Sequence, residues 1–374
     1  MKKFIKFLKS KKHFNKPKKK KYLILDSENS FIFKKYLNQK DVDVLDTRYE
    51  SFNLYVLIKT ILQFNFSFNS YIVEYIKSVD CEFIISFIDN NVFYYEVKKY
   101  FPNKKVILIQ NGMRTEFFFK KLSKISNLKI DYLLTFNDFY SEKYKQFVEG
   151  KFVSIGSFKN NLIPKNEHHQ KNKSIAFISS GPTANKNMNI FEKINLKIDD
   201  YFLPEKKLLP IISDYCKKHG LKLIILARSK LKEGFSYEKN FYKKILINGD
   251  FEFIDTLGFD KIYKISDISL LTVSIYSAFG LECLGRGNRT VIFNVRDKAT
   301  KIDSLNLFWS NNKVLVKGPF WSDEVIEEEV DRTFNFSINC SDIEWKQSLQ
   351  TIKPFLVMRD NGNQFFKNLL IKNE

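Results

Sequence analysis

The sequence contains little glycine, proline, cysteine or histidine for its length. Its 374 residues include 13 glycines, 8 prolines, 4 cysteines and 4 histidines. Low glycine and proline exclude a fibrous or low-complexity chain. The cysteines lie far apart without a CxxC pair, which excludes a disulfide framework and a cysteine-based zinc site. Neither the histidines nor the carboxylates have metal-ligand spacing. We therefore expect a globular protein of a reducing cytoplasm, without a metal or other cofactor.

A long uninterrupted apolar run is also missing. Lys59, Gln63 and several asparagines interrupt the most apolar long stretch, residues 52–76, so no transmembrane helix is expected. No apolar run of the signal-peptide type follows the N-terminal charges.

Positive charge, by contrast, is abundant. The formal net charge is +20, and eleven lysines fall within residues 1–21, which we call the basic tail. The tail also contains Phe4, Ile5, Phe7 and Leu8, a pattern typical of segments that lie on an anionic membrane. A disordered solubilising tail is the alternative. Since the remaining charge is scattered, we expect no dedicated nucleic-acid binding, and a cytoplasmic protein that binds the inner face of the cytoplasmic membrane peripherally.

Short apolar runs alternate with helical patterns along the rest of the chain, which predicts parallel α/β sheets. Predicted strands are 22–26, 42–46, 82–88, 105–110, 131–136, 152–156, 174–179, 221–227, 251–254, 268–275, 290–294 and 313–316. The length favours two domains with a cleft between them. We predict Rossmann-like domains at 22–160 and 174–350, a linker at 161–173 and a C-terminal helical segment at 351–374. Such halves facing across a cleft form the GT-B architecture.

Three glycines fall within eight residues of the stretch YSAFGLECLGRGNR (276–289). Predicted buried strands flank it, so it forms a turn, a helix and a turn at the carboxyl end of a strand, where parallel sheets bind ligands. If Ser277 begins the helix, its hydroxyl and the first backbone N–H groups form an anion site. A simple helix cap is the alternative interpretation.

Other residues of this stretch complete the predicted nucleotide site. Gly280 leaves room for a nucleotide, Glu282 is placed to accept hydrogen bonds from ribose hydroxyls, and Arg286 supplies a cation. Arg228 and Lys230 follow another predicted strand and are placed to bind phosphate, unless they are ordinary surface charges.

Polar turns also follow two predicted strands of the first half. Asn90, Asn91, Gln110, Asn111 and Arg114 are candidates for binding sugar hydroxyls, and the alternative is ordinary turn chemistry.

A carboxylate that acts as base or nucleophile would come from the same two turns. Asp89 is the first candidate and Glu116 the second.

Several phrases occur in a fixed order over nearly the whole chain. They are FIDNN, IQNGMR, DYLLTF, IGSFKNN, the GLECLGRG motif and GPFW. The set resembles bacterial surface carbohydrate biosynthesis proteins of the Leptospira-type transferase family, which is similar to GT-B β-Kdo transferases and capsule-synthesis transferases. The resemblance implies a glycosyltransferase of capsule, O-antigen or lipopolysaccharide synthesis. Its N-terminal domain would bind a glycan or lipid-linked glycan acceptor, and its C-terminal domain a nucleotide-sugar such as a CMP-linked ulosonic acid.

The chain departs from the family's phosphate and ribose motif at two positions, and Gln110 and Asn111 stand where capsule-type relatives have an acidic residue. Ala278 and Leu281 stand where the family motif has threonine and tyrosine, so donor binding could be altered. The retaining chemistry of the related Kdo transferases would give Asp89 the role of nucleophile. A phospho-alditol transferase, a non-catalytic scaffold for glycan assembly and an RNA- or membrane-associated protein that acts through its basic tail remain alternatives.

Overall fold

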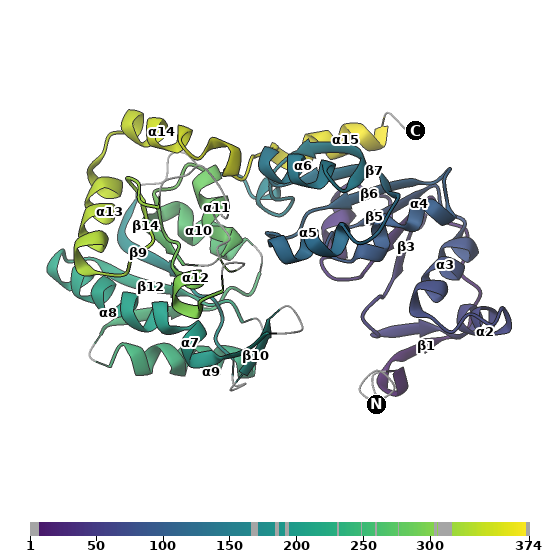
Figure 1. Ribbon diagram of the computed structural model, residues 1–374, viewed down its shortest axis with the longest axis horizontal. Helices are drawn as coiled ribbons and strands as arrows, with labels where there is room; N and C mark the ends of the chain where they lie inside the picture. Colours follow the sequence, from purple (N-terminus) through teal and green to yellow (C-terminus); the bar gives the residue numbers. More distant parts are fainter. Residues whose placement is uncertain are drawn as a thin grey trace. The chain divides into compact units, whose positions relative to one another are not determined.

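The computed structural model of the protein describes residues 7–165, 171–183, 187–190, 194–229, 232–247, 249–258, 260–275, 277–302, 305 and 316–371. The chain forms two compact units (Figure 1). Unit 1 comprises residues 1–112, 118–158 and 363–374, and unit 2 comprises residues 113–117 and 159–362. Of the predicted linker 161–173, residues 166–170 lie outside the described part.

A six-stranded parallel sheet with the strand order β3-β2-β5-β6-β7-β8 forms the centre of unit 1. Its strands are β2 (Tyr22–Leu25), β3 (Val42–Leu45), β5 (Phe83–Ser86), β6 (Lys105–Ile109), β7 (Leu128–Thr135) and β8 (Val148–Ser154). The central strands β2 and β5 are apolar and buried along their whole length, as expected when helices cover both faces of a parallel sheet. The strand order reverses between β2 and β5, and ligands bind at such switch points.

Helices and short 3₁₀ turns connect these strands. They are η1 (Ser30–Lys35), η2 (Gln39–Asp41), α2 (Leu54–Leu62), α3 (Phe68–Val79), η3 (Val92–Tyr95), α4 (Val97–Tyr100), α5 (Glu116–Leu122), α6 (Asp138–Lys145) and α15 (Gln364–Ile371). The C-terminal helix α15 packs within unit 1, where the Phe366 ring contacts the rings of Phe33, Tyr36 and Phe158.

The described part of the basic tail is folded. Strand β1 (Lys11–His13) pairs in parallel with β4 (Ser51–Asn53), and the Phe7 ring packs edge-on against Phe52 at 4.9 Å. The alternative of a disordered tail is therefore wrong for residues 7–13, because backbone pairing and an aromatic contact hold them. Phe4 and Ile5 lie outside the described residues.

A second six-stranded parallel sheet forms the centre of unit 2, with the order β13-β12-β9-β14-β15-β16. Its strands are β9 (Asn172–Ile178), β12 (Lys222–Leu226), β13 (Phe251–Ile254), β14 (Ser269–Ser274), β15 (Thr290–Phe293) and β16 (Trp321–Ser322). Numbered along the chain, this is the 3-2-1-4-5-6 order of a Rossmann sheet, with its switch point between β9 and β14. Strands β10 (Asn187–Ile190) and β11 (Ile194–Lys197) form a separate antiparallel pair.

Helices and short 3₁₀ turns connect the strands of this sheet. They are η4 (Asn160–Leu162), α7 (Ile198–Tyr201), α8 (Leu203–Lys218), α9 (Lys232–Ile245), α10 (Lys261–Ile268), α11 (Ala278–Gly285), α12 (Arg296–Thr300), α13 (Glu327–Asn339), α14 (Asp342–Gln350), η6 (Lys353–Phe355) and η7 (Asn361–Asn363). Figure 1 shows α8 and α13 on one face and α10 and α11 on the other.

The predicted α/β class with two Rossmann-like sheets is confirmed. The sequence patterns missed α5 and α10, because α5 is short and α10 runs directly into the apolar strand β14. Of the predicted strand 313–316, residues 313–315 lie outside the described part, and the sixth strand of the sheet is β16 instead. None of the helices that the structure describes is long and apolar enough to cross a bilayer.

Candidate functional site

The carboxyl ends of β9 and β14 meet at the switch point of unit 2. Helix α11 begins there directly after β14, and Ser277 is its N-cap, with the side-chain oxygen accepting a hydrogen bond from the Phe279 backbone N–H at 3.3 Å. The partial positive charge of a helix N-terminus therefore lies at the edge where parallel sheets bind ligands. The predicted placement of Ser277 at a helix start agrees with this geometry.

Each glycine of the GLECLGRG motif has a structural role. A side-chain Cβ at Gly280 would lie 2.6 Å from the Cβ of Ser274, and one at Gly285 would lie 1.9 Å from the carbonyl oxygen of Val357. Gly287 has a φ of +78°, which favours glycine. The predicted role of Gly280, to leave room for a nucleotide, is thus replaced by close packing between α11 and the last residue of β14.

Glu282 is buried at 8% exposure, and its carboxylate accepts a hydrogen bond from the Tyr263 hydroxyl. The tyrosine fixes this carboxylate one turn into α11, so a ligand that reaches Glu282 would meet an oriented acceptor.

Arg286 is fixed within the fold. It forms a buried ion pair with Asp267, and its N–H groups also donate to Asn160 Oδ1 and to the backbone oxygens of Ile163 and Pro164. All five guanidinium donors are engaged in this way. This geometry argues against the predicted binding of a nucleotide by Arg286.

Arg228 follows β12 at the same edge of the sheet, and it is exposed. Its Nη1 donates to the Ser180 carbonyl oxygen at 2.9 Å. The fully buried carboxylate of Glu238 accepts from the backbone N–H groups of Arg228 and Ser229 at 3.0 and 2.9 Å, which fixes the turn. The structure thus holds a solvent-accessible cation beside the end of β9. Lys230 lies outside the described residues.

A second buried ion pair supports the turn after β9. Arg296 and Glu205 have fully buried side chains and form two hydrogen bonds of 2.8 and 2.5 Å. Arg296 Nη2 also donates to Ser180 Oγ at 3.0 Å, and its guanidinium stacks over the Tyr201 ring at 4.1 Å. This pair connects α8 and α12 to the turn at the switch point. Sequence reasoning missed both residues, since a lone arginine and a lone glutamate 91 positions apart give no pattern.

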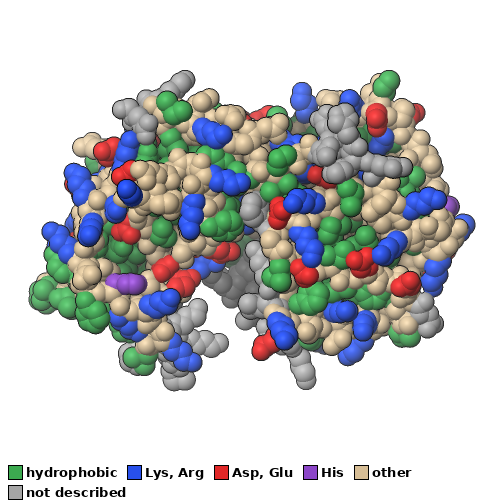
Figure 2. Space-filling model, turned by 180° about the vertical axis from the view of Figure 1, so that it is seen from behind, with side chains coloured by type: hydrophobic (Ala, Val, Ile, Leu, Met, Phe, Trp, Pro, Cys, Tyr) green, Lys and Arg blue, Asp and Glu red, His purple; other side chains and the backbone are tan. Residues whose placement is uncertain are grey.

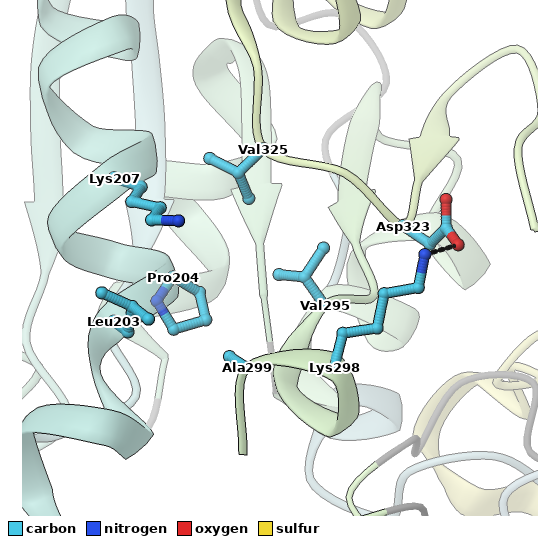
Figure 3. Close-up of a pocket in the computed structure, with 8 residues that line it drawn as sticks. All are labelled: Leu203, Pro204, Lys207, Val295, Lys298, Ala299, Asp323 and Val325. Carbon is cyan, nitrogen blue, oxygen red and sulfur yellow. Dashed lines mark hydrogen bonds and ion pairs between the residues drawn. The ribbon is translucent and has the colours of Figure 1, made fainter. Parts of the chain in front are cut away.

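A cavity of about 310 Å³ lies at the ends of β15 and β16, away from the switch point. Figure 3 shows Lys207 of α8 pointing into it, while Lys298 forms an ion pair with Asp323 on its wall. Apolar side chains line the rest of the cavity, namely Leu203, Pro204, Val295, Ala299 and Val325.

Unit 1 contains a cavity of about 540 Å³ at its own switch point. Asp26, Thr47, Arg48, Ile88, Asn90, Asn91, Val92, Tyr94 and Lys121 line it. Asp26 follows β2 in a left-handed conformation with φ of +78°, which is uncommon outside glycine and is found at functional sites.

The carboxylate of Asp26 organises this cavity. Its Oδ2 accepts from Thr47 Oγ1 and Arg48 Nε at 2.8 Å each, and its Oδ1 accepts from the Glu28 N–H. Asn90 and Asn91 are the lining residues that the sequence pattern predicted, and it did not indicate Asp26, Thr47, Arg48 or Lys121. Asp26 could have been found from the sequence, because it directly follows β2, which is the first strand of the unit 1 sheet along the chain.

Asp89 and Gln110 are fully buried. The Asp89 carboxylate accepts from the Asn111 backbone N–H at 3.0 Å and from the Tyr144 hydroxyl at 2.5 Å. Gln110 bridges the Gly112 carbonyl and the Phe136 backbone N–H. Both side chains thereby fix the turns after β5 and β6. Burial of its carboxylate argues against Asp89 as the predicted catalytic group, and Gln110 has its amide donor and acceptor engaged within the fold.

The remaining predicted residues of the first half lie after β6. Asn111, Arg114 and Glu116 are half-buried, Arg114 Nη1 donates to the Met113 carbonyl, and Glu116 begins α5. None of the three lines the 540 Å³ cavity.

Metal clusters and reactive thiols are two further kinds of site that side chains can form. Among the described residues, no group of three or more His, Cys, Asp or Glu side chains could hold a metal ion. Burial raises the pKa of the Cys81 and Cys216 thiols to about 12, so neither supplies a thiolate near neutral pH.

Comparison with known proteins adds the family. Residues 107–374 match the model of a Leptospira family described as "putative O-antigen biosynthesis protein". The chain belongs to this family. No curated protein sequence matches it significantly. The family match spans all of α11 and the ends of β9, β12 and β14, which are the elements of the unit 2 edge.

Solved structures show the fold. The wall teichoic acid polymerase TagF is 12% identical with a TM-score of 0.50, covering 95% of this chain and 90% of its own. The UDP-GlcNAc 2-epimerase of Methanocaldococcus jannaschii, in complex with UDP-GlcNAc and UDP, is 10% identical with a TM-score of 0.51 and covers 94% and 99%. The HepE protein of Anabaena, in complex with UDP and glucose, is 9% identical with a TM-score of 0.52 and covers 94% and 99%. These similarities identify a GT-B type of fold with two Rossmann-like domains.

Proposed function

We propose that the protein is a glycosyltransferase of bacterial surface polysaccharide synthesis that uses a nucleotide-sugar donor. The observation that carries this proposal is the edge of unit 2 at its switch point, where the N-terminus of α11 and exposed Arg228 supply positive charge. A diphosphate is the ligand that such an edge fits. The family match and the nucleotide complexes of two proteins with similar folds support the same interpretation.

Roles for individual residues follow from their geometry. Ser277, the first N–H groups of α11 and Arg228 would bind the donor phosphates, and Glu282 would accept a hydrogen bond from a ribose hydroxyl. The Arg296–Glu205 pair would position the Ser180 turn rather than contact the donor.

In unit 1, the 540 Å³ cavity would bind the acceptor glycan, with Asn90 and Asn91 as hydrogen-bond partners for its hydroxyls. Asp26 is nearly fully buried in the cavity wall and holds Thr47 and Arg48, so we propose that it positions these two side chains toward the acceptor. For Asp89 we propose a positioning role.

The donor nucleotide is the part of the proposal that an experiment decides most directly. Thermal unfolding of the full chain would be measured with CMP, CDP, UDP, GDP and ADP. A nucleotide at about 100 times its dissociation constant adds about 2.7 kcal/mol of stability. Each kcal/mol raises Tm by about 2–4 °C for a domain of this size, so we expect Tm to rise by about 5–11 °C. The family resemblance predicts that CMP is the donor nucleotide, whereas the two complexes named above contain UDP.

Matched variants locate the site. We expect Arg228→Gln and Glu282→Gln to reduce the stabilisation by the active nucleotide. Glutamine was chosen at position 282 because it retains an acceptor for the Tyr263 hydroxyl. Lys222→Gln is the control, because Lys222 is an exposed cation at the opposite end of the same strand β12. Equal loss in Lys222→Gln and Arg228→Gln would contradict the proposed site. If no nucleotide raises Tm, the non-catalytic scaffold replaces the enzyme.

A phospho-alditol transferase is the second candidate, favoured by the similarity to a wall teichoic acid polymerase. CDP-glycerol added to the same panel would stabilise the protein more than any nucleotide alone if this candidate holds.

A further inference from the structure

Helix α2 carries its apolar residues on the outside. Ile58, Ile61 and Leu62 are 57%, 45% and 71% exposed and share one face of the helix. The buried side instead includes Thr60, whose hydroxyl donates to the Val56 carbonyl at 2.8 Å. Val56 is buried on the same side, so the helix packs against the fold but leaves these three apolar side chains in solvent.

The turn after α2 extends the same apolar surface. Phe64 and Phe66 are 85% and 77% exposed. Phe64 has a φ of +56°, a left-handed conformation that is unfavourable for a bulky residue and that persists only where the surroundings enforce it. Its N–H donates to the Ile61 carbonyl at 2.9 Å, which closes the turn. The fold thus holds an aromatic ring in solvent at an energetic cost.

The folded part of the basic tail lies next to this helix, since β1 contacts α2. Leu8 and Phe14 on either side of β1 are 59% and 73% exposed, and Lys9, Lys11 and Lys16 are exposed between and beside them. We call this set the α2 surface: Leu8, Phe14, Ile58, Ile61, Leu62, Phe64, Phe66 and the three lysines. At the lower left of Figure 2, hydrophobic side chains gather over this end of unit 1 with lysines and arginines nearby.

Acidic residues are missing from both segments that form the surface. Residues 1–25 and 51–73 contain no Asp or Glu. Large contiguous apolar patches on soluble proteins mark interaction sites, and the charged side chains within this one are lysines, with exposed Glu50 beside Lys11 at its edge.

We propose that the α2 surface docks unit 1 on an anionic lipid bilayer. The apolar side chains would enter the interface while the lysines contact lipid phosphates. A second copy of the chain is the weaker candidate, because a two-fold contact would bring the lysines of this surface close to those of its copy. Nucleic acid would use the lysines but leave the apolar face uncovered. The proposal does not depend on the proposed enzyme activity.

Sedimentation of the full-length protein with lipid vesicles tests the proposal. Vesicles of phosphatidylcholine alone are compared with vesicles that also contain phosphatidylglycerol. We expect binding to the anionic vesicles only, weakened by salt. The double variant Phe64→Asn with Phe66→Ser should lower the partition coefficient by about tenfold or more, because it loses the free energy gained when two aromatic side chains are buried in the bilayer interface. Asparagine tolerates the left-handed conformation at position 64, so this variant should fold normally.

Controls separate this outcome from others. Ile343→Ser, at a 69% exposed apolar position of unit 2, should bind vesicles like the wild type. Replacing Lys9, Lys11 and Lys16 with glutamine should weaken binding and reduce its salt dependence. The proposal is overturned if the wild type ignores anionic vesicles, or if the phenylalanine variant binds them unchanged. It is also overturned if the wild type is a dimer in solution that this variant converts to a monomer.

Discussion

The two units build the same kind of parallel sheet but hold the turns at its carboxyl edge in different ways. At this edge unit 2 uses the buried ion pair Arg296–Glu205, which joins segments far apart in the chain, while a second buried pair, Arg286–Asp267, fixes the amino ends of β14 and β15. Unit 1 uses uncharged donors to buried side chains, as at Asp89, and keeps its ion pair Arg48–Asp26 on the wall of a cavity, with the arginine half-exposed. Buried ion pairs tolerate little displacement, because separating them leaves an unpaired charge in the interior. Unit 2 should therefore present a rigid edge and unit 1 a more adaptable one.

Breaking the Arg296–Glu205 pair should have the largest effect. Arg296→Met leaves the Glu205 charge buried without its partner, and we expect a loss of about 3–5 kcal/mol in the free energy of unfolding. The double variant Arg296→Met with Glu205→Leu should recover most of this loss. Urea denaturation measures both, and a double variant as unstable as the single one would show that the charge is not the cause.

In unit 1 the corresponding test is Tyr144→Phe, which removes the hydroxyl that donates to Asp89. Hydrogen bonds to charged groups contribute about 1.5–3 kcal/mol, so we expect a loss in that range, smaller than for Arg296→Met. The matched control is Tyr95→Phe, at a buried tyrosine whose hydroxyl donates to the backbone oxygen of Asp89, an uncharged acceptor, at 2.7 Å. Similar losses in the two tyrosine variants would contradict a special role for the bond to the Asp89 carboxylate.

Low pH should lower the stability of unit 2 by protonating the carboxylate of Asp267. Burial alone would raise the pKa of this carboxyl group, but hydrogen bonds from Arg286 and Asn288 outweigh burial and hold the pKa below its ordinary value of 3.8. Because the folded-state pKa is the lower one, the stabilisation is present above pH 3.8 and is lost as pH falls through the folded-state value. The difference in unfolding free energy between the wild type and Asp267→Asn should therefore narrow as pH falls through this range. A constant difference would exclude Asp267 as the group that titrates.

The smallest effect should come from Arg48→Gln in unit 1. The Arg48 side chain is 46% exposed, although the Asp26 side chain is 3% exposed. Asp26 keeps its hydrogen bonds from Thr47 and from the Glu28 N–H in this variant, so we expect a loss near the upper end of the range of about 0–1 kcal/mol that exposed ion pairs contribute. Urea denaturation should show a loss within that range. A loss as large as that of Arg296→Met would remove the distinction between the two edges.

Much of the fold could be predicted from the sequence, since buried parallel strands are short apolar runs with turns between them. The runs at 22–26, 82–88, 105–110 and 290–294 each contain an observed strand. Short helices without a clear period, such as α5, and the pairing of the basic tail with β4 depend on contacts distant in sequence, and the patterns did not indicate them.

The candidate site was predictable only where a residue directly follows a strand or begins a helix. Ser277, Arg228, Asn90 and Asn91 meet that condition, and the structure places them at the two carboxyl edges. Whether a polar side chain at such an edge faces a ligand or the interior depends on its partners. Arg286 and Asp89 lie close to those residues in sequence, yet the fold engages both internally.

The sequence by itself determined the two parallel sheets, the turn at α11 and the basic N-terminus, because apolar periodicity, glycine spacing and charge are local properties. The tertiary structure alone decided three other features. It paired Arg296 with Glu205, placed Asp26 on a cavity wall, and exposed the apolar face of α2 beside the lysines of the tail. Each of these depends on which distant segments meet, because burial and hydrogen-bond partners are properties of the packed chain and not of the residue.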